Sequence, residues 1–243
     1  MRFIDSHTHL GTWEQWHCET EELLRLMDEN GVDIAVTGHQ AGNGSGAFSF
    51  QQALRAVHSH EDRFRLMLWV NPRAADTEAA GQALREHRGR IACLKAHPLT
   101  ARLPLSDKAW EAYLPLCREY SLPFVSHTEQ DGFSDIQMLS ELARKNPDIS
   151  FIAVHTQMRG DHAAAARVIR ETANLYGDTT FLPAEEVPVC INIAGEDKLL
   201  FGTDAPIYGP RYAPYLRALQ EGLQSGTAEK LFHKNAEKLF RIP

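Results

Sequence analysis

The chain begins with RFIDSHTHL (residues 2–10), in which an apolar start runs directly into Asp5, His7 and His9 at alternate positions. In an extended strand, residues two positions apart point to the same face. The three side chains would then converge on one side of a first strand. Neighbouring imidazoles commonly bind transition metals. The stretch therefore predicts the first half of a metal site, and the remaining ligands must come from elsewhere in the chain.

Short apolar runs recur along the chain, with helical patterns between them. Strands are expected at residues 2–7, 33–38, 63–70, 90–96, 123–127, 150–155, 175–181 and 198–203. Amphipathic helical patterns include residues 20–31, 107–120, 134–147 and 227–240. Eight strands that alternate with helices predict an α/β fold, a (β/α)8 TIM barrel formed by residues 1–243 as one domain. A doubly wound open sheet is the competing fold. It is disfavoured because no G-x-G-x-x-G motif follows the first strand.

Residues 38–48, GHQAGNGSGAF, form a glycine-rich segment after the second predicted strand. A phosphate-binding loop is disfavoured because no Lys-Ser or Lys-Thr pair follows. We expect a mobile lid or a plain surface loop.

Composition narrows the class of protein. The net charge of −7 argues against nucleic acid as a partner, because phosphate binding needs clustered Lys and Arg. The chain contains no run of 18 apolar residues, so no membrane span is expected. The four cysteines are far apart, which predicts neither a disulfide framework nor a zinc ribbon. The first residues lack the apolar region of a signal peptide, so we expect a cytoplasmic protein.

Polar residues follow five of the eight predicted strands. In a TIM barrel the active site lies at the carboxyl ends of the strands, so these residues would face one mouth. The residues concerned are His7 and His9, Lys95 and His97, His127, His155, and Asp204.

A catalytic divalent ion takes about three protein ligands from His and carboxylate and keeps one position open. The predicted ligand set is His7, His9, His127 and Asp204. One ion is favoured over two, with zinc ahead of manganese. The ion would lower the pKa of bound water from ~15.7 toward ~7. Asp204 would then accept the proton of that water and pass it to the leaving group.

Three further residues have open roles. His155 could polarise a substrate carbonyl or hold a second ion. Lys95 could anchor a substrate carboxylate, form a carboxylated bridge between two ions, or pair structurally with Asp5. Arg73, after the third strand, could bind a carboxylate or phosphate, although a surface arginine is the commoner case.

With these residues identified, the chain resembles the amidohydrolase-related (amidohydrolase-2) branch of the amidohydrolase superfamily. The matching motifs are DSHTHL (5–10), LKAHP (94–98), SHT (126–128), VHT (154–156) and LLFGTDAP (199–206). The resemblance implies a metal-dependent enzyme in which His7, His9, His127 and Asp204 bind the metal and His155 is the catalytic or substrate-polarising histidine. It also implies that the strand-4 motif places Lys95 and His97 near the substrate.

We therefore predict a metal-dependent hydrolase of a small amide, ester or lactone. The alternative is a metal-dependent nonoxidative decarboxylase of a small unsaturated or aromatic acid. A nuclease similar to the TatD family is disfavoured, because that family carries a Glu on its fourth strand, where this chain has Lys95 and His97. A non-catalytic binding barrel is disfavoured because no predicted ligand is missing. The expected partner is a small-molecule substrate, and a homodimer stays open because members of this branch often dimerise.

Overall fold

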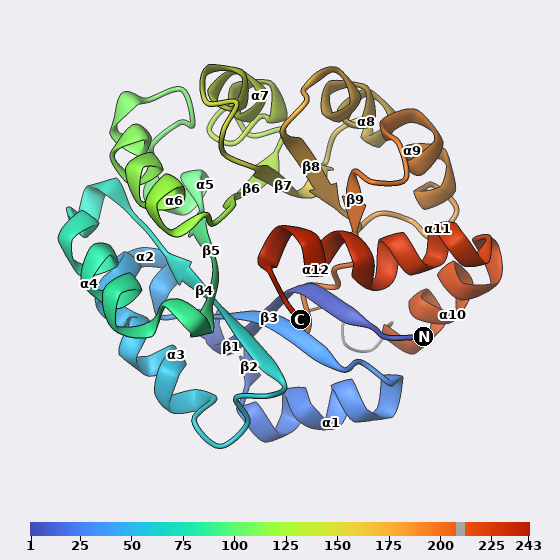
Figure 1. Cartoon of the computed structure of the whole chain (residues 1–243), viewed down its shortest axis with the longest axis horizontal. Helices are drawn as coiled ribbons and strands as arrows, with labels where there is room; N and C mark the ends of the chain where they lie inside the picture. Colours follow the sequence, from blue (N-terminus) through green and yellow to red (C-terminus); the bar gives the residue numbers. More distant parts are fainter. Residues whose placement is uncertain (208–211) are drawn as a thin grey trace.

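The computed structural model describes residues 1–207 and 212–243, and its described strands form one curled sheet (Figure 1). The order is β2-β1-β3-β4-β5-β6-β7-β8-β9, so strands after β2 are neighbours in chain order. The strands are β1 (Ile4–Trp13), β2 (Trp16–Cys18), β3 (Ile34–His39), β4 (Phe64–Trp69), β5 (Ile91–Ala96), β6 (Phe124–Glu129), β7 (Phe151–Met158), β8 (Leu175–Asp178) and β9 (Leu199–Leu200). All pairings are parallel except that of β1 with β2. The α/β prediction is confirmed, and each predicted strand overlaps an observed one.

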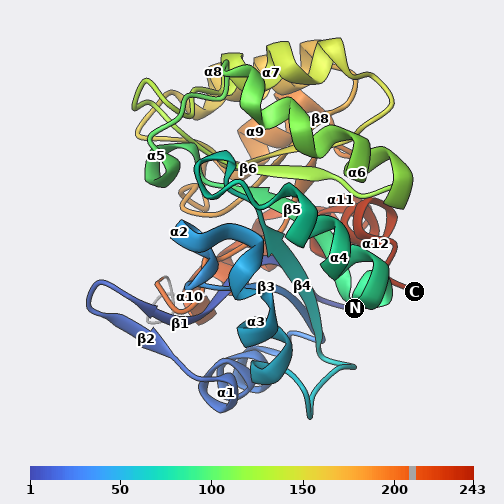
Figure 2. The same cartoon turned by 90° about the vertical axis from the view of Figure 1, so that its left-hand side faces the viewer.

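Most helices surround the outside of the sheet, while the last helix, α12, lies across one end of the curl (Figures 1 and 2). The helices are α1 (Thr20–Asn30), α2 (Gly42–Ser45), α3 (Phe50–Ala56), α4 (Thr77–His87), α5 (Pro98–Ala101), α6 (Leu114–Tyr120), α7 (Ile136–Lys145), α8 (His162–Glu171), α9 (Val187–Ala194), α10 (Tyr212–Gly222), α11 (Ser225–Glu229) and α12 (Asn235–Phe240). Short 3-10 turns are η1 (Gly46–Ser49), η2 (Pro72–Ala74), η3 (Arg88–Arg90) and η4 (Lys108–Tyr113). A π-helical turn, η6 (Lys230–Lys234), joins α11 to α12. None of the described helices is both long enough and apolar enough to span a membrane.

The last strand is shorter than the predicted segment 198–203, and residues 201–205 hydrogen-bond to β1. The Ser6 N–H donates to the Phe201 carbonyl at 2.9 Å, and the His9 N–H donates to the Ala205 carbonyl at 2.8 Å. The Asp204 N–H donates to the His7 carbonyl at 2.8 Å. These bonds hold Asp204 beside the two histidines of β1.

The interior of the curl is apolar where the strands begin and polar where they end. Its apolar cluster is covered by Leu239 and Phe240 of α12 and includes Ile4, Ile34, Val36, Met67, Cys93, Val125, Ile152, Val154 and Leu200. Side chains two positions apart share a face of a strand. The face that carries Cys93 therefore continues into Lys95, and the face that carries Val125 continues into His127. As a result, polar side chains lie at the carboxyl ends of the strands, next to the apolar cluster inside the curl.

The glycine-rich segment, which was expected to be a mobile lid or a plain surface loop, contains two short helical turns. Its middle forms α2 and η1, which are held by the buried carboxylate of Asp76. That carboxylate accepts the Ala47 N–H at 2.6 Å, and the side chain of Asn71 donates to the Gly44 carbonyl at 2.6 Å. These bonds supply the anchors that the polar, glycine-rich composition does not reveal.

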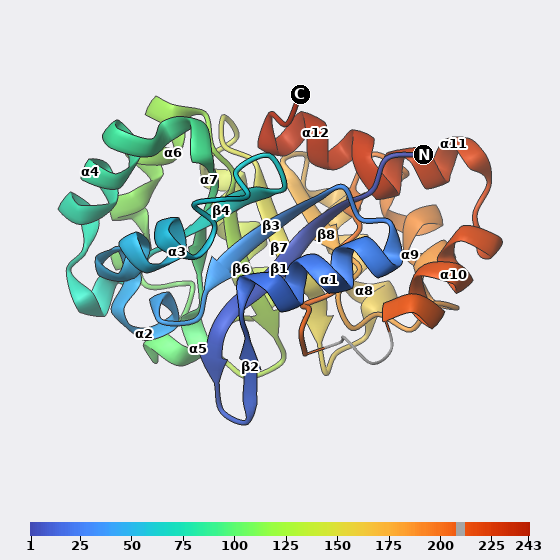
Figure 3. The ribbon, with the colours of Figure 1, turned by 90° about the horizontal axis from the view of Figure 1, so that it is seen from below.

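The β1–β2 hairpin projects from the rest of the molecule (Figure 3). Trp13 lies at its tip and is 38% exposed. The four cysteines are buried and free, in agreement with the prediction that they form no disulfide framework.

Candidate metal centre

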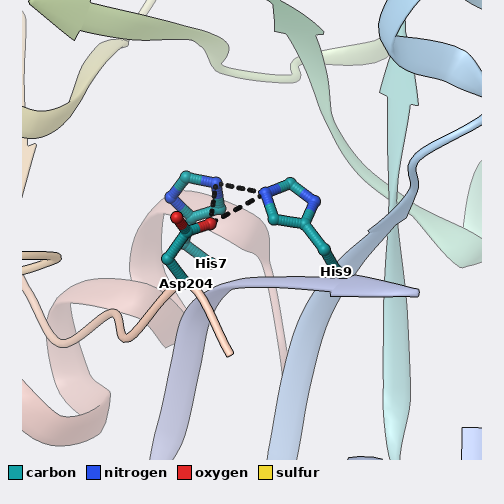
Figure 4. Close-up of side chains that lie close together, drawn as sticks. All are labelled: His7, His9 and Asp204. Atoms are coloured by element: carbon teal, nitrogen blue, oxygen red, sulfur yellow. Dashed lines mark hydrogen bonds and ion pairs between the residues drawn. The ribbon is translucent and has the colours of Figure 1, made fainter. Parts of the chain in front are cut away.

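His7, His9 and Asp204 bring three ligand atoms together at the carboxyl ends of the strands (Figure 4). The Nε2 atoms of His7 and His9 lie 3.0 Å apart. Asp204 Oδ1 lies 3.0 Å from Nε2 of His9 and 3.6 Å from Nε2 of His7. All three residues are buried. The arrangement joins the first strand to the segment after the last one.

The opposite nitrogens of the two imidazoles face oxygen atoms. His9 Nδ1 lies 3.3 Å from the Gly38 carbonyl oxygen, and His7 Nδ1 lies 3.3 Å from Asp178 Oδ2. An imidazole that donates from Nδ1 carries a lone pair on Nε2. With these tautomers, two lone pairs and a carboxylate converge with no proton between them. A cation is the group that such a set accommodates.

The spacing also fits a metal ion. Donors bound to one zinc ion at ~2.1 Å, with bond angles of about 90–110°, lie about 3.0–3.4 Å apart. The three observed separations are 3.0, 3.0 and 3.6 Å. Burial, with a further contribution from Lys95, holds the pKa of His7 well below its usual range. His7 therefore stays neutral at pH 7, as a metal ligand must be.

Asp5 does not join this set, contrary to the expectation from its alternate position. The β1–β3 register shifts between Asp5 and Thr8, which breaks the alternation. The Asp5 carboxylate instead accepts hydrogen bonds from the hydroxyls of Thr203, at 2.5 Å, and Tyr212, at 3.0 Å. Burial raises its pKa to about 7, against these lowering bonds. Asp5 therefore bonds Tyr212 and Thr203, the residue that precedes Asp204, and does not lie among the converging ligand atoms.

Lys95 lies beside the trio, with Nζ 3.5 Å from His7 Nε2. The side chain is 1% exposed, and burial lowers its pKa to about 8. The principal carboxylates that oppose this shift are Asp178 and Asp204, so the suggested structural pair with Asp5 is not the dominant one. Lys95 places a positive charge at the edge of the trio.

His155 stands in an irregular part of β7. His155, Thr156 and Gln157 all have positive φ angles, at 71°, 44° and 70°. Between the paired positions of β6 and β7, the latter strand contains extra residues, as in a bulge. Non-glycine residues with positive φ gather at functional sites. The ring of His155 lies 5.4 Å from that of His7, and no described residue hydrogen-bonds its buried Nδ1.

His127 faces the same region but belongs to a second ligand group, with Glu129 and Asp131. Its Nε2 lies 3.1 Å from Glu129 Oε2, while Arg159 binds the other Glu129 oxygen at 2.9 Å. The ring of His97 stacks on that of His127, with centroids 4.1 Å apart and planes inclined by 10°. The structure thus brings three of the four predicted ligands into one group and leaves His127 bonded to Glu129.

These residues surround a cavity of about 180 Å³. Its polar lining includes His7, His9, Gln40, Asn43, Lys95, His97, His127, His155 and Asp204. Its apolar lining consists of Trp13, Trp69, Met158, Phe181 and Ile207. Arg73 does not line it: the side chain is exposed and contacts the Arg102 carbonyl at 3.5 Å. The predicted substrate role of Arg73 has no support in this geometry.

The model of the amidohydrolase family matches residues 4–242. The chain belongs to the amidohydrolase family. None of the curated proteins matches it. Among solved structures, an amidohydrolase from Burkholderia multivorans with bound zinc is similar at 14% identity and a TM-score of 0.77, with both chains covered fully (100%).

Two other similar structures carry names of enzymes. One is a 5-carboxyvanillate decarboxylase from Novosphingobium aromaticivorans, complexed with manganese and 4-hydroxy-3-methoxy-5-nitrobenzoic acid. It is 17% identical with a TM-score of 0.75, over 99% of this chain and 96% of that one. The other is a probable 2-pyrone-4,6-dicarboxylic acid hydrolase from Acinetobacter baumannii with citric acid bound. It is 15% identical with a TM-score of 0.72, over 100% of both chains. At these identities the likeness shows the fold.

Sequence reasoning missed two residues of this amidohydrolase site. Asp178 ends β8 and lies beside His7, and Glu129 follows His127 by two positions on β6. A carboxylate at the end of a strand is the signal that identified Asp204. Asp178 was missed because the predicted strand 175–181 runs past it, whereas β8 ends there. Glu129 shares a strand face with His127, so the alternation applied to the first strand would have found it.

Proposed function

We propose that this amidohydrolase is a metal-dependent hydrolase of a small amide, ester or lactone. One observation carries the proposal: two imidazole nitrogens and a carboxylate oxygen converge within 3.0–3.6 Å, on a cavity that also holds Lys95 and His155. Such a donor set, with space beside it, is typical of catalytic metal sites.

His7, His9 and Asp204 would hold a single ion, for which zinc is favoured and manganese is the alternative. When bound, the ion would supply Lewis acidity, lowering the pKa of water and polarising a carbonyl group. Because His127 is bonded to Glu129, it would join the ligands only by giving up that bond.

The other residues act on the substrate and its protons. Asp204 presents a carboxylate that can take a proton from water and pass it to the leaving group. His155 is neutral at pH 7, because burial, with a contribution from His127, holds its pKa well below the usual range. A neutral imidazole can donate its N–H to a carbonyl oxygen as negative charge develops there. Lys95 would attract an anionic group of the substrate.

We infer that the curled sheet closes as a (β/α)8 barrel, with this site at the carboxyl mouth of its strands. The backbone bonds of residues 201–205 to β1 support closure, as does the parallel bridge between Thr8 and Ala205. In such a barrel, loops after the strands surround the substrate. The small cavity favours a small molecule as the partner.

A decarboxylase is the second candidate, favoured by the character of the cavity walls. Trp13, Trp69 and Phe181 give the cavity aromatic surfaces that suit a flat ring. Two of the similar solved structures are named as decarboxylases of the aromatic acids 5-carboxyvanillate and 2,6-dihydroxybenzoate. In this reading Lys95 would contact the substrate carboxylate.

The test is a paired assay on protein of measured metal content. Protein loaded with zinc or manganese is offered small esters, lactones and N-acyl amino acids, and separately aromatic acids with detection of carbon dioxide. His9→Ala serves as the inactive control. Hydrolysis that depends on the metal supports the main proposal, whereas carbon dioxide release without hydrolysis replaces it with the second candidate. Loaded protein that is inactive on both panels contradicts both.

A further inference from the structure

Asp178 connects the two histidines that the proposed function separates into ligand and catalyst. It ends β8, and its side chain is 1% exposed. Its Oδ1 accepts the N–H groups of His155, at 2.8 Å, and Thr180, at 3.1 Å. Its Oδ2 lies 3.3 Å from Nδ1 of His7.

We infer that Asp178 is a positioning residue that selects the tautomer of His7 and fixes the backbone of His155. The inference rests on the proposed function, because it concerns the same site. It assigns a task to a buried carboxylate that neither binds the ion nor faces the substrate in the proposal.

Asp178 determines which ring nitrogen of His7 carries the proton. Its Nδ1 is buried and has no well-aligned hydrogen-bond partner among the described residues, and Asp178 Oδ2 is the carboxylate oxygen facing it. Bonds of this kind are often long before a ligand binds and tighten afterwards. A carboxylate can only accept, so the proton must be on Nδ1 of His7. Nε2 then presents its lone pair to His9 and Asp204. Partners of this kind commonly orient metal-binding histidines.

Asp178 also holds the backbone of β7 at His155. His155 has a φ of 71°, in the left-handed region that non-glycine residues seldom adopt. Its N–H is captured by Asp178 Oδ1, and the Thr156 hydroxyl donates to the Asp178 carbonyl at 2.5 Å. Strained backbone persists only where surrounding contacts determine it. Asp178 supplies two of these contacts from the neighbouring strand, and they hold the His155 ring at the cavity.

The two tasks can be separated by Asp178→Asn. Asparagine keeps an oxygen for the His155 and Thr180 N–H groups, so the backbone of β7 is retained. Its amide N–H₂ would face His7 Nδ1 and force that atom to accept. The proton of His7 would then move to Nε2, where it points at His9 and Asp204. A protonated Nε2 cannot bind a metal ion.

The experiment measures the His7 tautomer and the metal affinity together. Nitrogen-15 NMR of metal-free protein, with His7→Gln used to assign the signals, reports which nitrogen carries the proton. We expect Nδ1–H in the wild type and Nε2–H in Asp178→Asn, with zinc affinity from chelator competition about 10- to 100-fold lower in the variant. Asp76→Asn is the matched control, since Asp76 is also a buried carboxylate that accepts backbone N–H groups, but it contacts neither histidine.

The outcomes distinguish this inference from the proposed function. If NMR of the wild type places the proton on Nε2 of His7, the inference is overturned by the wild-type protein alone. Unchanged zinc affinity in Asp178→Asn also overturns it. If the wild type binds no zinc, but the proton of His7 is on Nδ1 in the wild type and on Nε2 in Asp178→Asn, the metal-dependent hydrolase is contradicted. The positioning role of Asp178 is then still supported.

Discussion

The structure contains two groups of potential metal ligands: His7, His9 and Asp204, which all line the cavity, and His127, Glu129 and Asp131, of which only His127 lines it. The two groups differ in what their polar atoms already bind. In the first group, His7 and His9 have their Nδ1 atoms beside oxygens, while their Nε2 atoms face Asp204. In the second, the oxygens of Glu129 contact His127 and Arg159. The third member of that group, Asp131, accepts two backbone N–H groups and a hydroxyl at the start of the segment that leads to α7.

The comparison shows that closeness of ligand atoms does not define a metal site. In the second group, Glu129 is already paired with Arg159 and His127, and Asp131 already accepts hydrogen bonds from its own loop. When both imidazoles of the first group carry their proton on Nδ1, their Nε2 lone pairs point at one another and at Asp204, an arrangement that favours a cation between them. We therefore propose the first group as the site of the ion.

The largest expected effect separates the two groups directly. His9→Ala removes one of the converging lone pairs, so we expect it to abolish stoichiometric metal binding while the fold is retained. Asp131→Asn should keep about one ion per chain, because Asp131 serves the backbone. Plasma mass spectrometry on dialysed protein, with circular dichroism for folding, measures both. Metal lost from Asp131→Asn but kept by His9→Ala would move the ion to the second group.

The first group is also backed by a buried carboxylate, Asp5, whose pKa rises from 3.8 to about 7 on folding. Between these values the folded chain binds more protons than the unfolded chain, so the free energy of unfolding falls as pH rises from about 4 to about 7. At about 1.4 kcal/mol per pKa unit, the decrease from Asp5 is on the order of 3–4 kcal/mol. Asp178, with a pKa raised to about 6, adds a decrease of the same sign.

Denaturant titrations of metal-free protein across this pH range test the contribution of Asp5. Asp5→Asn should flatten the slope, because asparagine does not titrate and can still bond Thr203 and Tyr212. Subtracting the two curves removes the contribution of Asp178, which both proteins share. Parallel curves for wild type and variant would refute the buried, costly charge on Asp5.

Much of the fold could be read from the sequence, because burial imposes a pattern on it. Each parallel strand is covered on both faces and therefore appears as an apolar run, as in residues 150–155. The helical turns of the glycine-rich segment were not predicted, because they are held by Asp76, which is distant in sequence and gives no local signal. The strand ending at Asp178 was predicted to run to residue 181, although the chain turns after the aspartate.

The site was predictable where it depends on strand ends, and unpredictable where it depends on hydrogen bonds. His7, His9 and Asp204 follow from position alone. The failure for Asp5 arises from one shift of register in β1, which sequence alternation cannot reveal. Arg73 lies after the expected strand but on an exposed turn, which shows that proximity to a strand end is insufficient without an inward direction.

The smallest expected effect concerns His127, the member of the second group that also lines the cavity. Its Nε2 is bonded to Glu129, so His127→Ala should weaken zinc binding by only about 10-fold, within the range for residues around a metal rather than bound to it. Chelator competition compares it with His9→Ala and with Glu129→Gln, which keeps the imidazole but weakens its partner. If His127→Ala loses the metal as completely as His9→Ala, His127 is the fourth ligand predicted from the sequence. In that case its bond to Glu129 must break when the ion binds, and Glu129→Gln should then increase zinc affinity.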